Sequence, residues 1–127
     1  MVVYNFQRRF ADPIAAGTKT HTIRRNGKRR HARPGEELQL YTGLRTKAAA
    51  KIIVPDPVCI DALTIAIDVR EDTIASIAIK GFPIQELENF AKSDGFLHLK
   101  EMHEFFLRMH GPGVFHGTLI EWRRTGG

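Results

Sequence analysis

The chain has 127 residues, of which 43% are hydrophobic and 26% are charged, and its formal net charge is +5. This length and composition predict one ordered domain over residues 1–127 and exclude a disordered chain. No apolar run reaches the roughly 20 residues that cross a bilayer, and the start MVVYNFQRRF lacks the basic-then-apolar order of a signal peptide. We therefore expect a cytoplasmic protein with no membrane partner.

A short helix of about one turn is predicted over ADPIAAG, residues 11–17. Asp12 is expected to cap its N-terminus, Pro13 suits the first helical position, and Gly17 suits the left-handed residue after its end. The next segment, TKTHTIR at residues 18–24, is rich in β-branched residues and predicts an extended strand. The helix should therefore aim the backbone of this strand in a defined direction.

A run of basic residues follows, RRNGKRRHAR at residues 24–33. Its cationic side chains, with no acidic residue among them, are Arg24, Arg25, Lys28, Arg29, Arg30 and Arg33. Such concentrated positive potential favours polyanionic partners. A solvated loop around Asn26 and Gly27 is the other interpretation, and the charge pattern leaves both open.

Short strands are predicted for most of residues 34–80. A turn at Pro34 and Gly35 precedes a strand in which Leu38, Leu40 and Thr42 share one face. Further strands are predicted at AAAKIIV (48–54), VCIDALTIAIDV (58–69) and TIASIAI (73–79), with REDT as a hairpin connection between the last two.

Cys59 is the one cysteine, so no intramolecular disulfide can form. Its neighbours in the predicted strand are apolar, and no cation flanks it to stabilise a thiolate. We expect an inert, half-buried thiol rather than a nucleophile.

Two helices are predicted after residue 82. Pro83 can open the first, which carries an apolar stripe of Leu87, Phe90 and Ala91 and ends at SDG. The second lies in LHLKEMHEFFLRMHG, where Leu99, Met102, Phe106 and Met109 recur at helical spacing. The phenylalanines and methionines of these helices are interpreted as core residues.

The segment GVFHGTLIEW, residues 113–122, alternates and predicts a closing strand whose Trp122 packs in the core. Several short strands, two helices and a returning C-terminal strand indicate the α+β class. The expected architecture is a small mixed β-barrel with flanking helices.

Several kinds of site are excluded by spacing. His98, His103 and His110 lie five and seven residues apart, not at the three- or four-residue spacing of helical metal ligands. There is no glycine-rich phosphate loop before a helix and no Gly-x-Ser-x-Gly elbow. These patterns exclude nucleoside triphosphatase and α/β-hydrolase activities, and we predict neither a metal site nor a cofactor.

Three segments of the chain stand out together: RFADPIAAGTKTHTIRR, RPGEELQLYTG and AKSDGF. With these segments the chain resembles the ASCH family, a branch of the PUA-like superfamily. The resemblance extends from about Phe6 to Trp122. Its most specific part is the motif Gly-x-Lys-x-x-Thr-x-Arg, formed here by Gly17, Lys19, Thr22 and Arg24. The resemblance implies a PUA-like barrel with a cleft lined by this motif, and RNA or nucleosides as ligands.

Small bacterial members of this family include an N4-acetylcytidine amidohydrolase with a catalytic lysine, threonine and glutamate. The resemblance places the lysine on Lys19, the threonine on Thr22 and the glutamate on Asp94, which is one methylene shorter. Chemically, Thr22 would be the nucleophile, Lys19 the base and Asp94 the proton donor. In a regular strand Lys19 and Thr22 point to opposite faces, so they meet only if the chain bends near Thr20 or His21.

The alternative for Asp94 is a helix-junction residue whose carboxylate accepts backbone N–H groups beside the turn at Gly95. Arg24 either holds a phosphate or carboxylate or forms a salt bridge with a neighbouring acid. Thr22 can equally reflect β propensity, and Lys19 a solvated strand position.

A wider binding surface is also predicted. If the strand from Leu38 returns beside the basic run, then Tyr41, Arg45 and Lys47 extend one positive surface, with Tyr41 available for stacking on a base. The other interpretation packs Tyr41 in the barrel and leaves the cations solvated. Three functions remain: binding of RNA or a modified nucleoside, which we favour, deacetylation of N4-acetylcytidine-like nucleosides, and ribonuclease action. The sequence indicates no oligomeric state.

Overall fold

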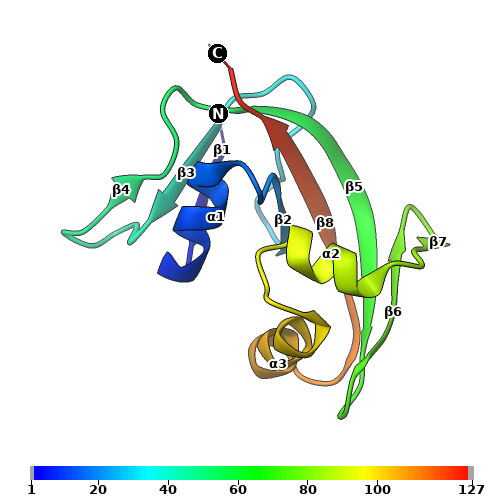
Figure 1. The fold of residues 1–127 in the computed structure, drawn as a ribbon. Coiled ribbons are helices and arrows are strands. Elements are labelled where there is room, and N and C mark those ends of the chain that lie inside the picture. Colours follow the sequence, from blue (N-terminus) through cyan, green and yellow to red (C-terminus); the bar gives the residue numbers. More distant parts are fainter. Residues whose placement is uncertain (1, 126–127) are drawn as a thin grey trace.

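The computed structural model describes residues 2–125, and these confirm the α+β class (Figure 1). The strands are β1 (Val2–Phe6), β2 (His21–Arg25), β3 (Leu38–Thr42), β4 (Ala50–Lys51), β5 (Val58–Val69), β6 (Ile74–Ile79), β7 (Phe82–Pro83) and β8 (Gly113–Arg123). The helices are the 3-10 turn η1 (Arg8–Phe10), α1 (Ala11–Ala16), α2 (Leu87–Ser93) and α3 (Leu99–His110). No helix within residues 2–125 is both long enough and apolar enough to cross a membrane.

The larger sheet has the strand order β2-β8-β5-β6-β7 and is antiparallel throughout. Its centre is the long pair β5 and β8, whose curved ribbons dominate Figure 1. Strand β5 has the predicted bounds, and the hairpin to β6 is also confirmed. Alternate residues Ile65, Ile67 and Val69 are buried, which is the pattern of a strand with one face on the core.

The smaller sheet has the order β1-β3-β4, with β1 parallel to β3. As predicted, β3 buries Leu38 and Leu40 on one face. An isolated bridge between Glu37 and Val58 connects the neighbourhood of this sheet to β5. The predicted barrel is not confirmed, because the strands pair in two sheets that do not close on each other.

The predicted helix before β2 is present, but Asp12 does not cap it. Because η1 continues directly into α1, the N-cap position falls on Phe10, and Asp12 lies within the first turn. Gly17 ends the helix as predicted, with a left-handed φ of 83° and its N–H directed to the carbonyls of Pro13 and Ile14. The strand then begins at His21, three residues later than TKTHTIR suggests.

The predicted start of the next helix at Pro83 is wrong. Lys80 and Gly81 have φ values of 55° and 82°, so the chain turns sharply and Phe82–Pro83 pairs with the end of β6. Helix α2 therefore starts at Leu87. Helix α3 has its predicted position, with His98 as its N-cap.

The core contains buried residues from both sheets and from the helices α1, α2 and α3. Trp122 is buried, as predicted, and packs edge to face on Phe6 with their ring centroids 6.2 Å apart. Met109 departs from the predicted core stripe, because 53% of it is exposed. Its place is the rim of a pocket rather than the core.

Candidate functional site

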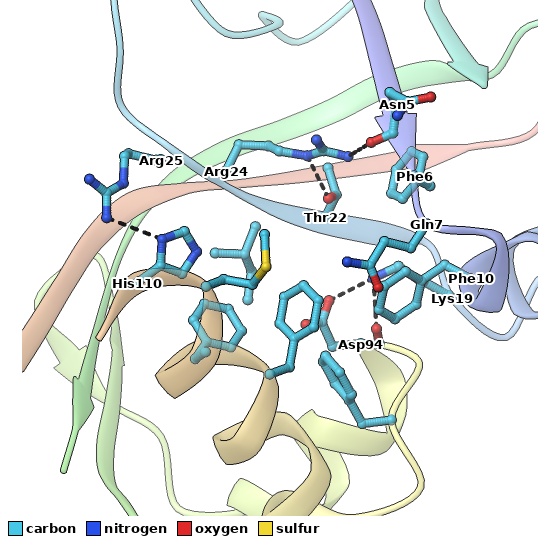
Figure 2. A pocket seen from close by; sticks show the side chains of 15 residues that line it. Asn5, Phe6, Gln7, Phe10, Lys19, Thr22, Arg24, Arg25, Asp94 and His110 are labelled. Carbon is cyan, nitrogen blue, oxygen red and sulfur yellow. Dashed lines mark hydrogen bonds and ion pairs between the residues drawn. The ribbon is translucent and has the colours of Figure 1, made fainter. Parts of the chain in front are cut away.

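A pocket of about 370 Å³ lies where the N-terminal segment, β2, the end of α2 and α3 converge (Figure 2). Five of the predicted site residues line it: Lys19, Thr22, Arg24, Arg25 and Asp94. Its other lining residues are Asn5, Phe6, Gln7, Phe10, Ile23, Phe96, Phe105, Phe106, Met109 and His110. The volume is in the range of ordinary small-molecule sites.

Lys19 and Asp94 form a buried ion pair, with exposed fractions of 3% and 4%. The Lys19 ammonium donates to Asp94 Oδ1 and to the Asp94 carbonyl oxygen, each at 2.7 Å. Burial lowers the pKa of Lys19, and the charge of Asp94 opposes this effect. Burial also acts to raise the pKa of Asp94, but Lys19 and then His21 outweigh it, so that pKa is lowered. Asp94 is therefore held as a carboxylate.

Local backbone structure places both partners of the pair. Gly17 ends α1 so that the N–H of Lys19 reaches the carbonyl of Pro13 at 3.1 Å. Asp94 is the C-cap of α2, and Gly95 follows it with a φ of 97°. A Cβ added at Gly95 would lie 2.9 Å from Phe10 Cδ1 and 3.1 Å from Lys19 Cδ. The glycine is thus needed for the turn and for the close approach of Lys19.

The structure bears on the helix-junction interpretation of Asp94, whereas its role as a proton donor stays a prediction. Asp94 does end a helix, but its carboxylate binds the side chain of Lys19 rather than backbone N–H groups. The predicted opposition of Lys19 and Thr22 across a strand does not arise, because Lys19 precedes the first residue of β2. Both residues therefore line one pocket.

Thr22 and Arg24 lie on one face of β2, as residues two apart in a strand do. Arg24 Nε donates to Thr22 Oγ1 at 3.0 Å, and its Nη2 donates to the Asn5 carbonyl oxygen at 2.7 Å. The guanidinium also lies over the Phe6 ring, 4.7 Å from its centroid. Burial lowers the pKa of Arg24. The alternative of a salt bridge to a neighbouring acid is not observed for this arginine within residues 2–125.

Sequence reasoning missed two histidines at this site. His21 Nε2 lies 3.1 Å from Asp94 Oδ1 in a close polar contact that lacks the geometry of a good hydrogen bond. The His21 ring stacks on Phe90 at 5.3 Å. His110 Nδ1 lies 3.1 Å from Arg25 Nη2, and burial together with Arg25 lowers the pKa of His110.

Phe106 is a buried core residue, as predicted, and Phe10 and Phe96 are buried with it. Sequence reasoning did not show that these rings also form an aromatic wall of the pocket. Phe10, Phe96 and Phe105 meet one another with centroid separations of 5.3 to 6.0 Å. Phe106 continues the wall along α3. The Lys19 ammonium lies 5.0 Å from the centroid of Phe10, so the wall also contacts the ion pair.

The remaining predicted binding residues lie outside this pocket. Arg29 and Arg30 line a second pocket of about 380 Å³ beside β1, together with His31. Arg30 is engaged there by Glu36, with both hydrogen bonds at 2.7 Å. The others line neither pocket: Gly17, Lys28, Arg33, Tyr41, Arg45 and Lys47. The structure therefore does not join the whole basic run and the segment from Tyr41 to Lys47 into one pocket.

Within residues 2–125, no group of three or more histidine, cysteine, aspartate or glutamate residues is arranged to hold a metal ion. No known protein family, curated protein or solved structure matches the chain. Membership of the ASCH family therefore stays a prediction from the motif residues.

Proposed function

We propose that the protein binds RNA or a nucleoside in the pocket beside β2. The observation that carries this proposal is the composition of that pocket, in which an aromatic wall faces a buried polar cluster and two arginines. On this proposal the chain is an ASCH-like domain of the PUA-like superfamily. A cytoplasmic location belongs to the same prediction.

Base recognition requires an apolar face and a few fixed polar groups. Phe105 is half-buried and lines the pocket, so it offers a ring for stacking, which is worth about 1–3 kcal/mol per base. The Lys19–Asp94 pair offers ammonium and carboxylate groups already fixed by 2.7 Å contacts. A base edge carries the matching donors and acceptors.

The test is a binding titration with the four ribonucleosides, N4-acetylcytidine and a short single-stranded RNA. We expect saturable binding that Phe105→Ala weakens by about tenfold or more, since it removes a stacking ring. Phe82→Ala is the matched control, because Phe82 is 75% exposed on β7 and lines neither pocket. RNA affinity should also fall as salt rises. Absence of binding by every ligand at low salt would refute the proposal.

Deacetylation of an N4-acetylcytidine-like nucleoside is the second candidate, because Lys19, Thr22 and Asp94 do line one pocket. In this reaction Thr22 Oγ1 attacks the acetyl carbonyl, the C–N bond breaks, the amine leaves with a proton, and water releases acetate from the threonine ester. The resting ion pair opposes the required protonation states, since Lys19 must be neutral to act as the base and Asp94 protonated to act as the donor.

Release of acetate from N4-acetylcytidine tests this candidate. Thr22→Ser keeps the hydroxyl group and should retain activity, whereas Thr22→Val keeps the shape and should abolish it. Equal rates for the two variants would exclude Thr22 as the nucleophile, and no release by the wild type would exclude the reaction.

A further inference from the structure

The charges that line the pocket do not balance. Its lining contains three cationic side chains, Lys19, Arg24 and Arg25, and one carboxylate, Asp94. Lys19 and Asp94 neutralise each other at 2.7 Å. Two guanidinium groups therefore face the pocket with no carboxylate assigned to them.

Arg24 is the more buried of these two groups, and its hydrogen bonds go to neutral oxygens. They are Thr22 Oγ1 at 3.0 Å and the Asn5 carbonyl at 2.7 Å. Nearby rings offset part of the cost of burying the charge, since the guanidinium carbon lies 4.7 Å from the Phe6 centroid. A guanidinium with neutral partners in a pocket wall remains able to attract an anion.

Arg25 lies at the opposite end of the pocket from the Lys19–Asp94 pair, with Arg24 between them (Figure 2). Its contact is His110 Nδ1 at 3.1 Å, an imidazole nitrogen that accepts from the guanidinium when it carries no proton. The salt bridges within residues 2–125 include neither Arg24 nor Arg25. This end therefore presents donors to a ligand without a competing internal carboxylate.

From this arrangement we propose that the ligand is a nucleotide, whose phosphate lies against Arg25 while its base stacks on the aromatic wall toward the Lys19–Asp94 end of the pocket. The inference rests on the proposed function and adds the chemical class of the ligand. A guanidinium fork matches two phosphate oxygens, and the contact is stronger than one to a neutral group. A free nucleoside would leave Arg25 without an anion.

The experiment compares matched ligands by titration calorimetry at constant ionic strength. The probes are the four ribonucleosides, their 5′- and 3′-monophosphates, and inorganic phosphate. We expect at least one monophosphate to bind about tenfold to a hundredfold more tightly than its nucleoside, as charge-assisted contacts predict. Phosphate alone should bind far more weakly than that monophosphate.

Arg25→Gln is the informative variant, because Arg25 is exposed and its replacement should not impair folding. It should remove most of the preference for the monophosphate, measured as the ratio of monophosphate affinity to nucleoside affinity. Arg123→Gln makes the same change in net charge at the C-terminal end of β8, where Arg123 is exposed and lines neither pocket. This control should keep the preference.

The outcomes separate this inference from the function on which it rests. Nucleosides that bind as tightly as their monophosphates would overturn the inference and leave nucleoside binding intact. A preference that survives in Arg25→Gln would also overturn the assigned position of the phosphate. No binding by any nucleoside, nucleotide or RNA would refute both proposals. A short RNA with and without a 5′-phosphate then identifies the source of the bound phosphate. Tighter binding of the 5′-phosphorylated RNA identifies the end of an RNA chain, and equal affinities identify a free nucleotide or an internal phosphate.

Discussion

Replacing Asp94 by asparagine tests the central feature of the pocket, its buried ion pair. The substitution keeps the size of the side chain and removes its charge. Lys19 then retains the 2.7 Å hydrogen bond to the carbonyl oxygen of residue 94 but loses its counter-ion. With an exposed fraction of 3%, the ammonium cannot recover this loss from water.

The expected loss of stability follows from what happens to the orphaned charge. Removing one partner of a buried pair costs about 3–5 kcal/mol. The remaining carbonyl contact and the ability of Lys19 to lose its proton favour the lower limit, about 3 kcal/mol at pH 7. For a domain of this size, that corresponds to a fall in Tm of about 10 °C.

The pH dependence has a definite sign. The pKa of Asp94 is lowered in the folded protein, because Lys19 and His21 outweigh the effect of burial. Its charge therefore stabilises the fold above the ordinary carboxyl pKa, and this contribution disappears as pH falls through the folded value. The stability difference between wild type and Asp94→Asn should be largest near neutrality and shrink below about pH 4.

Urea denaturation followed by circular dichroism at pH 7 and pH 3 measures both expectations. Asp68→Asn is the control, because it breaks the 3.2 Å pair with Arg70 at the surface and should cost less than about 1 kcal/mol. The reasoning fails if Asp94→Asn is no more destabilising than this control. It also fails if the Asp94→Asn difference is unchanged at pH 3.

Two further predictions concern the strands that support the pocket. Gly117→Ala places a Cβ 2.5 Å from the Arg24 carbonyl oxygen, so it should separate β2 from β8 and destabilise the fold by about 3 kcal/mol. Gly27→Ala is the control, because a Cβ there meets nothing within 4 Å and should change stability by less than about 1 kcal/mol. Urea denaturation measures both variants, and equal losses of stability would contradict the packing argument. Cys59 is 1% exposed and burial raises its pKa, so its native thiol should react with a disulfide reagent at pH 8 at least tenfold more slowly than in urea, and equal rates would contradict its burial.

Sequence reasoning succeeded where structure depends on neighbouring residues. Strand β5 and its hairpin follow from alternating apolar residues and a polar connection, and the end of α1 follows from Gly17. It failed at Pro83, where a residue suited to a helix start instead pairs in a strand. The positive φ of Lys80 makes that turn possible, and a lysine gives no sequence signal for it.

The candidate site was also predictable where its residues are close in sequence and not where they are distant. Lys19, Thr22 and Arg24 are close in sequence, and their motif predicted a shared cleft. The contact between Lys19 and Asp94 joins residues 75 apart, so local pattern could suggest Asp94 only through the resemblance. His110 pairs with Arg25 through packing of α3, which the sequence does not specify. His21 and Ile23 are two residues apart in β2 and so share one face of the strand. This shared face with an apolar residue was the available signal for an inward-facing histidine.

The ion pair also determines which function the resting pocket can perform without rearrangement. The hydrogen bonds of the Lys19 ammonium go to Asp94, and Thr22 Oγ1 accepts from Arg24, so Lys19 is engaged as a donor and not as a base for Thr22. Deacetylation requires a ligand that separates Lys19 from Asp94 and compensates both charges. The proposed binding of a nucleotide requires no such step, because its phosphate would meet Arg25, which has no internal carboxylate partner among the salt bridges of residues 2–125. The resting ion pair therefore favours the proposed nucleotide binding over deacetylation, which would require the ligand to separate Lys19 from Asp94.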